Sequence, residues 1–486
     1  MDPWKFIDKN FKEHKDFLIK HQIDSYNQFL NQINSIFKEN NPIKIFLDRD
    51  ENSGDYNCEC HLYMGGKDGS KIYFGKPVMY ENKKMCLMYP NSARLKNMSY
   101  NFTIHYDVDV EYLIKDDKSN IEETNEKTKK NKKESDYTIH SDTVTNILLG
   151  RFPVMLQSDM CILKGLNENI RYNMGECRND YGGYFIIDGK EKAIISQEKF
   201  ADNLIYLRDK VNDKYSHSAE IRTVSEDSSK PMRKFGIYIV TPSSSYTNDQ
   251  IVVNIPNVRQ PIPLFIVMRA LGIISDRDII QTCLLDLEKN SKMIDCFIPS
   301  VHDAANIFTQ SAALEYIKTF TKGKTIATVM EILMNYLLPN IGELNFKAKA
   351  YFIGHMVYRL LNIKLQKEKV TDRDNFKYKR VDTPGILLYN LFKEYYNLQR
   401  KNIFQTIDKE YYYNPSAYNS DFTVLVRNNV AKIFKEKIVE EGFRRAFKGN
   451  WGSTAHTKKE GIVQDLNRLS YNSFISHIQI SNTFKI

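Results

Sequence analysis

Every second residue from Phe102 to Ile114 is apolar, and the residues between them are mostly polar or charged. Successive side chains of a β-strand point to opposite faces, so this spacing places seven apolar side chains on one face. The pattern therefore predicts one long strand with a single apolar face, which commits this part of the chain to a β-sheet.

Helical and extended patterns alternate along the rest of the chain in long blocks. Apolar residues from Ile19 to Phe37 recur at steps of three and four, which is typical of one helix face. The mixture predicts an α+β protein. The predicted blocks are helical at 4–38, 261–382 and 385–447, extended at 137–200 and 201–260, and polar at 448–486 with a helix beginning near Gly461.

Length and composition restrict the class of protein. A chain of 486 residues predicts two to four domains. Its 69 Lys and Arg against 60 Asp and Glu permit a polyanionic partner without requiring one. No apolar run reaches the about 18 residues of a membrane span, and Met1–Lys5 lacks the pattern of a signal peptide. Seven cysteines at irregular spacings favour reduced thiols, so we expect an intracellular protein without a membrane partner.

Residues 115–136 contain a single apolar residue, Ile121. Such a segment cannot bury enough surface to offset the entropy of ordering it, so it predicts a disordered surface insertion. Its basic run, Lys127 to Lys133, is compatible with nucleic-acid binding or a localisation signal. A solvated insertion remains the favoured interpretation.

Two groups of residues resemble metal ligands. Asp107 and Asp109 are spaced like a carboxylate pair for a hard cation, and a metal-dependent nucleotidyltransferase is the corresponding hypothesis. A solvated strand face produces the same pattern and is favoured. Cys58, Cys60 and His61 lack the paired C-x₂₋₄-C spacing of structural zinc sites. The sequence contains neither a G-x-x-x-x-G-K-[ST] loop nor a G-x-S-x-G turn.

Two further segments are more informative. Within Gly175–Glu198, Asp188-Gly189 separates two short apolar runs and predicts a β-hairpin. Within Phe443–Arg468, basic residues flank a glycine-containing stretch with an aromatic residue, Trp451. Cations hold phosphates and an aromatic ring can stack on a base, so this composition suits nucleic-acid contact as well as it suits a solvated loop.

These segments belong to an ordered series of motifs between residues 24 and 483. The motifs and their order along the chain resemble those of the second-largest subunit of multisubunit DNA-dependent RNA polymerases, in the eukaryotic, archaeal and large-DNA-virus branch. The motifs are Asp24–Phe29, Tyr89-Pro90 with Ala93–Asn97, Gly150–Leu156, Glu176–Glu198, Arg269–Ile273, Asp372-Arg373-Asp374 with Lys379-Arg380, and Asn450-Trp451-Gly452 continuing through Leu466-Asn467-Arg468 and Ser476-His477 to Asn482-Thr483.

The resemblance implies a multidomain architecture. Residues 1–203 and 383–447 would form the two parts of a protrusion, residues 204–382 an inserted lobe, and residues 448–486 the beginning of a fork near the downstream edge of the transcription bubble. Insertion of the lobe would make the protrusion discontinuous in sequence.

The resemblance also implies a division of labour. In the family, the metal-binding aspartates belong to the largest subunit, and the remaining catalytic groups lie downstream of Ile486. No catalytic or metal-binding residue is therefore expected in this chain, and Mg²⁺ would bind elsewhere in the assembled polymerase. The implied partners are the largest subunit, the C-terminal part of the second-largest subunit, smaller polymerase subunits, DNA and the RNA–DNA hybrid.

Ten residues match positions that the family places near nucleic acid. For each of them the alternative is an ion pair or hydrogen bond within the protein. Gln464, Asn467, Arg468 and His477 would line the hybrid, Lys458, Lys459 and Trp451 lie in the fork loop, and Arg373, Lys379 and Arg380 would lie where lobe and protrusion meet.

Two departures from the family pattern weaken this transfer. Ile478-Gln479-Ile480 replaces a Leu-Arg-Arg sequence, which removes two positive charges, and Asp465 adds a negative one. We interpret these changes as the mark of a divergent lineage, with the cytoplasm or virion of a large DNA virus as the expected location and the nucleus as the alternative.

Two functional hypotheses follow from the resemblance. The first is that the chain is the N-terminal part of a polymerase second-largest subunit. The alternative is a stand-alone nucleic-acid-binding or decoy module derived from a polymerase. The chain stops inside the last motif, which favours a fold that continues in another segment.

Overall fold

The computed structural model describes residues 2–13, 16–49, 56–115, 137–225, 232–242, 249–304, 306–413, 418, 422–455, 457–479 and 481–483. The chain forms two compact units: unit 1 comprises Met1–Glu198 with Val381–Ile486, and unit 2 comprises Lys199–Arg380. The names protrusion, lobe and fork, with boundaries expected at 203/204, 382/383 and 447/448, stay predictions. The insertion predicted at 115–136 lies outside the described residues except for Lys115.

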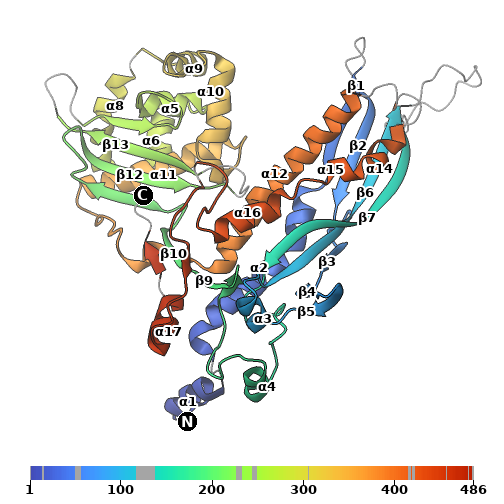
Figure 1. The fold of residues 1–486 in the computed structure, drawn as a ribbon. Coiled ribbons are helices and arrows are strands. Elements are labelled where there is room, and N and C mark those ends of the chain that lie inside the picture. The colour runs from blue at the N-terminus through green and yellow to red at the C-terminus, as the bar shows by residue number, and fades with distance from the viewer. Residues whose placement is uncertain are drawn as a thin grey trace, which may run out of the picture. The chain divides into compact units, whose positions relative to one another are not determined.

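The longest strands of unit 1 confirm the prediction from residues 102–114. Strand β6 (Asn101–Lys115) pairs with β7 (Tyr137–Pro153) in an antiparallel register that runs from Asn101↔Pro153 to Lys115↔Tyr137 (Figure 1). The alternating apolar side chains of β6 are buried from Phe102 to Tyr112. The same sheet contains β1 (Ile43–Arg49), β2 (Tyr56–Met64) and β3 (Ile72–Phe74), and a separate hairpin comprises β4 (Val78–Glu81) and β5 (Lys84–Leu87).

Helices α2 (Phe17–Asn40) and α12 (Pro384–Tyr413) pack on each other and bury their apolar stripes in the core of unit 1. The helical block predicted at 4–38 is present as two helices, α1 (Pro3–Glu13) and α2. The periodic apolar residues all lie on α2, and α1 buries none of its side chains. Further described helices of unit 1 are α3 (Pro90–Leu95), α4 (Glu168–Asn173), η5 (Phe422–Val424), α14 (Leu425–Asn428), α15 (Val430–Ile433) and α16 (Ile438–Phe447).

The hairpin predicted around Asp188-Gly189 is present as β8 (Phe185–Ile187) and β9 (Lys190–Ile194). Both turn residues have positive φ, 50° and 76°, as a tight two-residue hairpin requires. The helix predicted near Gly461 is wrong: this segment instead adds strand β17 (Val463–Asp465) to the edge of β9, and helix α17 (Tyr471–Gln479) begins ten residues after Gly461.

The end of the described chain returns to its beginning within unit 1. The side-chain nitrogen of Gln22 on α2 donates to the carbonyl of Ile478 on α17 at 2.9 Å. Strand β18 (Ser481–Thr483) pairs in parallel with residues 196–198 of β10 (Ser196–Phe200). The last described residues therefore pack against segments from the first part of unit 1.

Unit 2 combines a five-stranded sheet with helices, as the extended pattern at 201–260 and the helical pattern at 261–382 predict. Its strands are β11 (Ile205–Asp209), β12 (Tyr215–Thr223), β13 (Arg233–Val240), β14 (Ile251–Asn254) and β15 (Ile262–Pro263), in this spatial order. Its helices are α5 (Leu264–Ala270), α6 (Asp276–Leu284), α7 (Ser291–Ile294), η1 (Asp295–Phe297), α8 (Ile298–Asp303), α9 (Gln310–Thr319), α10 (Ile326–Glu331), η2 (Ile332–Tyr336), η3 (Pro339–Ile341), α11 (Phe346–Lys364) and η4 (Phe376–Tyr378), and β16 (Lys379–Asp382) follows them.

Helix α11 illustrates how unit 2 is packed. Ala350, Ile353, Val357 and Leu360 lie on its buried face, as their helical spacing predicts. None of the helices among the described residues is both long and apolar enough to cross a bilayer.

Candidate nucleic-acid interface

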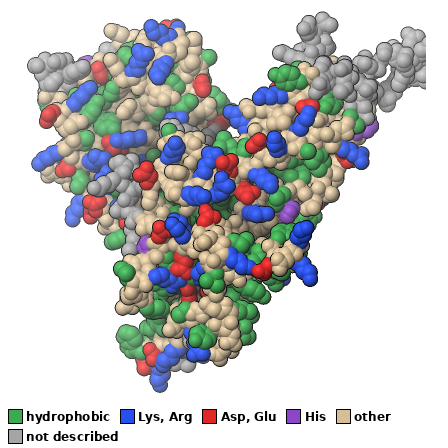
Figure 2. All heavy atoms as spheres, in the orientation of Figure 1, with side chains coloured by type: hydrophobic (Ala, Val, Ile, Leu, Met, Phe, Trp, Pro, Cys, Tyr) green, Lys and Arg blue, Asp and Glu red, His purple; other side chains and the backbone are tan. Residues whose placement is uncertain are grey.

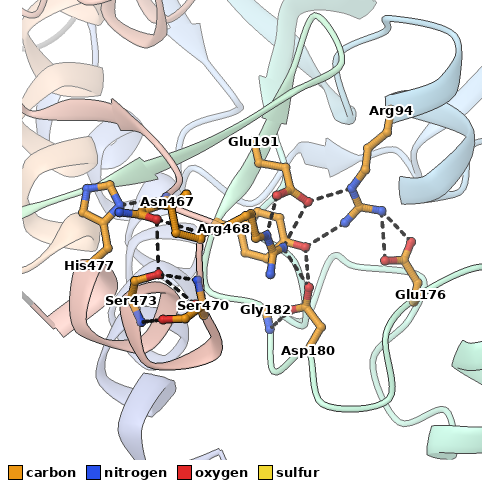
Figure 3. A network of polar contacts seen from close by, with 12 residues as sticks. Arg94, Glu176, Asp180, Gly182, Glu191, Asn467, Arg468, Ser470, Ser473 and His477 are labelled. Carbon is orange, nitrogen blue, oxygen red and sulfur yellow. Dashed lines mark hydrogen bonds and ion pairs between the residues drawn. The ribbon is translucent and has the colours of Figure 1, made fainter.

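A closed network of two arginines and three carboxylates lies beside the β8–β9 hairpin (Figure 3). Arg94 of α3 bonds both oxygens of Glu176 at 2.9 Å and reaches Glu191 of β9 at 2.8 Å. Arg468 bonds the other oxygen of Glu191 at 2.7 Å and Asp180 at 3.0 Å. Glu191 thus joins the two arginines, which come from segments far apart in the sequence.

Tyr184 forms the centre of this network. Its hydroxyl accepts from Arg94 and donates to Asp180, both at 2.7 Å. The guanidinium of Arg468 lies 4.9 Å from the Tyr184 ring centre and 4.6 Å from that of Phe474. Burial raises the pKa of Tyr184 well above its ordinary value, so the hydroxyl keeps the proton that it donates.

The electrostatics of Glu191 follow from its two partners. Burial by itself would raise the pKa of Glu191, but hydrogen bonds and charges from Arg468 and Arg94 outweigh burial and hold this pKa below its ordinary value. Glu191 is therefore ionised at neutral pH. Sequence reasoning assigned Arg468 to nucleic acid, whereas the structure places its guanidinium in ion pairs within the protein.

His477 and Gln464 lie in hydrogen-bonding contact. The backbone N–H of Asn467 donates to His477 Nδ1 at 3.1 Å, so Nδ1 must carry a lone pair. The proton is consequently on Nε2, which donates to Gln464 Oε1 at 3.1 Å, and Gln464 Nε2 donates to the carbonyl of Gly461 at 3.0 Å. Burial lowers the pKa of His477, in agreement with a neutral ring. The predicted contacts of these side chains with the hybrid stay predictions.

Asn467 organises the turn that leads into α17. Its side-chain oxygen accepts from the backbone N–H of Leu469 at 2.9 Å and from the hydroxyl of Ser473 at 3.1 Å. Asp465, which departs from the family pattern, lies nearby and bonds Lys192 at 2.6 Å. This hydrogen bond lowers the pKa of Asp465. The added negative charge is therefore compensated within the sheet.

The fork-loop residues differ in accessibility. Lys458 is exposed, and the backbone N–H of Lys459 donates to the carbonyl of Trp451 at 3.1 Å. The ring of Trp451 is only 5% exposed and belongs to the core of unit 1. The ring of Trp451 lies among apolar core side chains in this structure, and its predicted contact with nucleic acid stays a prediction.

Arg373 and Lys379 lie around one aromatic ring in unit 2. Their charged groups are 4.8 Å and 4.3 Å from the ring centre of Phe200, and the guanidinium of Arg222 on β12 is 5.1 Å from it. Cations at these distances from a ring face are attracted by its quadrupole. The third predicted residue, Arg380, is exposed and donates to backbone carbonyls of its own turn.

A cavity of about 80 Å³ opens beside this cluster. Its single acidic residue, Glu220, is buried and bonds Arg208 at 3.3 Å and Lys234 at 3.0 Å. Within the described ranges, neither Arg222 nor Arg373 has a carboxylate at ion-pair distance. The cavity is lined by Phe200, Tyr206, Arg208, Glu220, Ile221, Arg222, Lys234 and Arg373.

Sequence reasoning did not identify Arg222 or Phe200, and the alternative that it raised for Arg373 is not observed. Arg373 forms no ion pair with the neighbouring Asp372 or Asp374 in the part of the chain that the structure describes, and Asp372 accepts the backbone N–H of Asp374 at 3.1 Å. Arg222 and Phe200 lie in segments without a charged motif, so only the sheet geometry reveals the cluster.

The candidate metal ligands bind protein groups instead. Asp109 accepts from Lys71 at 2.7 Å and from Thr143 at 3.1 Å, and Asp107 accepts from Tyr73 at 3.1 Å. Among the residues that the structure describes, no three His, Cys, Asp or Glu side chains are grouped as metal ligands.

The candidate zinc ligands are also separated. Cys60 is buried in the core of the β2 sheet, and burial raises its thiol pKa to about 12. His61 instead bonds Glu59 at 3.1 Å, and side chains of adjacent strand residues point to opposite faces. Cys60 and His61 therefore cannot share one tetrahedral ion here.

Comparison with known proteins defines the class. The family described as RNA polymerase beta subunit matches residues 17–432, so this chain belongs to that family. It is 30% identical to DNA-directed RNA polymerase II subunit 2 of Arabidopsis thaliana, and 31% identical to subunit RPB2 of Meyerozyma guilliermondii. Each match covers 99% of this chain, but only 39% and 38% of the respective relative.

The chain therefore spans less than half the length of these relatives and corresponds to their N-terminal part. Another relative differs in this respect. DNA-directed RNA polymerase subunit Rpo2N of Methanocaldococcus jannaschii is 27% identical, and the match covers 96% of this chain and 83% of that protein.

Proposed function

We propose that this chain works as the N-terminal part of the second-largest subunit in an assembled DNA-dependent RNA polymerase. In this role it forms one wall of the DNA cleft and contacts DNA and the RNA–DNA hybrid. The family match over residues 17–432 carries the proposal. A polymerase subunit acts where DNA is transcribed, so the proposal places the protein inside the cell. The viral location inferred from the departures from the family pattern stays a prediction.

The distribution of charge supports contacts through separate sites. On the face shown in Figure 2, Lys and Arg side chains are interspersed with Asp and Glu rather than collected in one uniform patch. The exposed Lys458 in unit 1 and the arginines around Phe200 in unit 2 are positioned to bind phosphate oxygens. Binding at such sites releases counterions and makes affinity depend on salt.

The rigid segment around His477 supports a positioning role in unit 1. Its hydrogen bonds fix the amide of Gln464, and the Arg468 network attaches the same segment to the β8–β9 hairpin. A preorganised backbone loses little entropy when it contacts a ligand. We propose that these residues present this segment to the hybrid without taking part in the chemical step.

Mg²⁺ in the assembled enzyme would supply the two-metal phosphoryl-transfer chemistry. The carboxylates of Asp107 and Asp109 do not fit such an ion, since Lys71, Tyr73 and Thr143 already use them. The proposal therefore assigns metal binding to the largest subunit and to the C-terminal part of the second-largest subunit. Smaller polymerase subunits complete the predicted partners.

Affinity purification of the tagged chain from its native source tests the proposal. We expect a largest-subunit homologue and the C-terminal second-subunit sequence to be recovered in equal amounts, as a separate chain or as part of a longer tagged protein. Recovery of the chain alone, or only with nucleic acid, would overturn the proposal and favour a stand-alone or decoy module.

A further inference from the structure

The loop between α16 and β17 has a defined shape. Trp451 and Lys459 form an isolated β-bridge at its base. The backbone N–H groups of Thr457 and Lys458 both donate to the carbonyl of Thr454, at 3.1 and 3.0 Å. Gly452 has a φ of +87°, and a Cβ on it would lie 2.3 Å from the carbonyl oxygen of Thr457. The two sides of the loop therefore cross at a glycine.

One carboxylate oxygen holds the tip of this loop. Glu394 Oε1 accepts from the backbone N–H of Ser453 at 2.9 Å and from the hydroxyl of Thr457 at 2.6 Å. It also accepts from the hydroxyl of Ser453 and from the backbone N–H of Thr454, the latter at 3.3 Å. Four donors from a short polar loop thus converge on a single acidic side chain.

The helix that carries Glu394 provides a rigid support. Leu391, Phe392, Tyr395 and Tyr396 surround it on α12 and are buried in the core of unit 1. Hydrogen bonds to an ionised acceptor are shorter and stronger than neutral ones. The loop is therefore attached to the core through Glu394, although the loop itself is polar and partly exposed.

We propose that Glu394 is a positioning residue that holds the fork loop in one conformation and thereby presents Lys458 and Lys459 to a nucleic-acid phosphate. This inference rests on the proposed function. A loop ordered before binding has less freedom to lose on contact, so its lysines bind more tightly than the same lysines on a mobile loop. The role belongs to a residue outside the motifs that sequence reasoning assigned to nucleic acid.

Glu394→Gln in the purified polymerase tests this role, because it keeps the size of the side chain and removes its charge. We expect backbone hydrogen exchange at residues 453–459 to accelerate about tenfold. We expect affinity for a fluorescein-labelled RNA–DNA hybrid, measured by anisotropy, to fall about threefold to tenfold. Thr457→Val removes the hydroxyl that donates to Glu394 Oε1, and it should likewise accelerate exchange and weaken binding.

A double-mutant cycle distinguishes positioning from general destabilisation. If Glu394 acts through the lysines, Glu394→Gln should cause no further loss of affinity in the Lys458→Ala/Lys459→Ala background. Glu441→Gln is the matched control, because it removes a carboxylate whose ion pair with Arg445 is exposed on α16. This control should leave both exchange and affinity unchanged.

The inference would be overturned by unchanged exchange at 453–459 in Glu394→Gln, or by an affinity loss that persists in the background without the lysines. A wild-type affinity of Lys458→Ala/Lys459→Ala itself would refute the phosphate contact of these lysines and with it the positioning role. Failure of the wider proposal would be seen separately, as failure to recover the other polymerase subunits.

Discussion

Arginines occupy two contrasting environments in this protein. In unit 1, Arg94 and Arg468 bond Glu176, Glu191 and Asp180. In unit 2, Arg222 and Arg373 lie against Phe200, and within the described chain neither has a carboxylate at ion-pair distance. The same side chain therefore closes a network in one unit and remains available to an external anion in the other.

This contrast shows why motif membership does not define a residue's role. Arg468 and Arg373 both belong to motifs that resemble polymerase sequences, and both were assigned to nucleic acid on that basis. The two arginines differ in their neighbouring carboxylates. Arg468 would have to give up its ion pairs before its guanidinium could bind a phosphate, whereas Arg373 could bind a phosphate without losing an ion pair. We therefore expect stability to depend mainly on the ion-paired arginines of unit 1. We expect salt-sensitive binding of nucleic acid to depend mainly on the arginines beside Phe200 in unit 2.

Arg94→Met should produce the largest effect in this comparison. Removing one partner from a buried ionic network leaves charges uncompensated and costs about 3–5 kcal/mol of the free energy of unfolding. Both tryptophans, Trp4 and Trp451, lie in unit 1, so urea unfolding followed by tryptophan fluorescence reports on this unit. Arg445→Met, which removes an exposed ion pair, should change stability by only about 0.5 kcal/mol. Equal effects of the two variants would contradict the distinction.

Acid should weaken the same network through Glu191. The pKa of Glu191 is depressed in the folded state, so its contribution is fully present above the unfolded value of about 4.3 and is lost as pH falls through the lower folded pKa. Glu191→Gln should lower the free energy of unfolding of unit 1 by about 2 kcal/mol at neutral pH. It should also make the stability of unit 1 decline less steeply as the pH falls below about 4.3. Urea midpoints measured across the acid range test this prediction, and an unchanged acid profile would count against it.

Replacing the fork-loop lysines tests binding in unit 1. Lys458→Ala/Lys459→Ala should weaken retention on DNA and reduce the slope of log affinity against log salt by about one to two ions. Lys458→Ala by itself should leave the stability of unit 1 unchanged, because Lys458 is exposed. Binding isotherms at several salt concentrations provide the measurement, and an unchanged slope would remove these lysines from the interface.

Arg373→Ala should change stability far less than Arg94→Met and sharpens the contrast between the two arginines. Loss of an exposed cation–π contact costs about 0.5–1 kcal/mol. The salt slope for DNA should fall by about one ion, since one phosphate contact is lost. Thermal unfolding and the same isotherms measure both quantities. A stability loss as large as that of Arg94→Met would show that Arg373 is a structural residue as well.

Local sequence patterns correctly predicted those elements that are determined by the spacing of apolar residues or by a turn dipeptide. The alternation from Phe102 to Tyr112 identifies a strand because one face is buried along its whole length. Asp188-Gly189 identifies a hairpin because both residues adopt positive φ. The helix expected near Gly461 was wrong because a short polar segment has no period of its own and takes its structure from the free edge of β9.

The candidate site was predicted less completely, since its contacts join distant segments. The burial of Trp451 depends on the core that surrounds it, and the partners of Arg468 come from residues nearly three hundred positions earlier. The convergence of Arg222 and Arg373 on Phe200 likewise requires the folded sheet. The family resemblance identified candidate residues, but only three-dimensional neighbours separate ion-paired residues from available ones.

The discontinuity of unit 1 has a consequence for synthesis on the ribosome. Residues 196–198 pair with 481–483, and Gln22 bonds Ile478, so unit 1 cannot be completed until its last described strand has been made. Unit 2, in contrast, is continuous in sequence and becomes fully available much earlier. At about 5–20 residues per second, the first part of unit 1 waits roughly 15–60 s for its partner segments. During that interval its apolar surfaces remain exposed, which makes the nascent first part a natural client for chaperones.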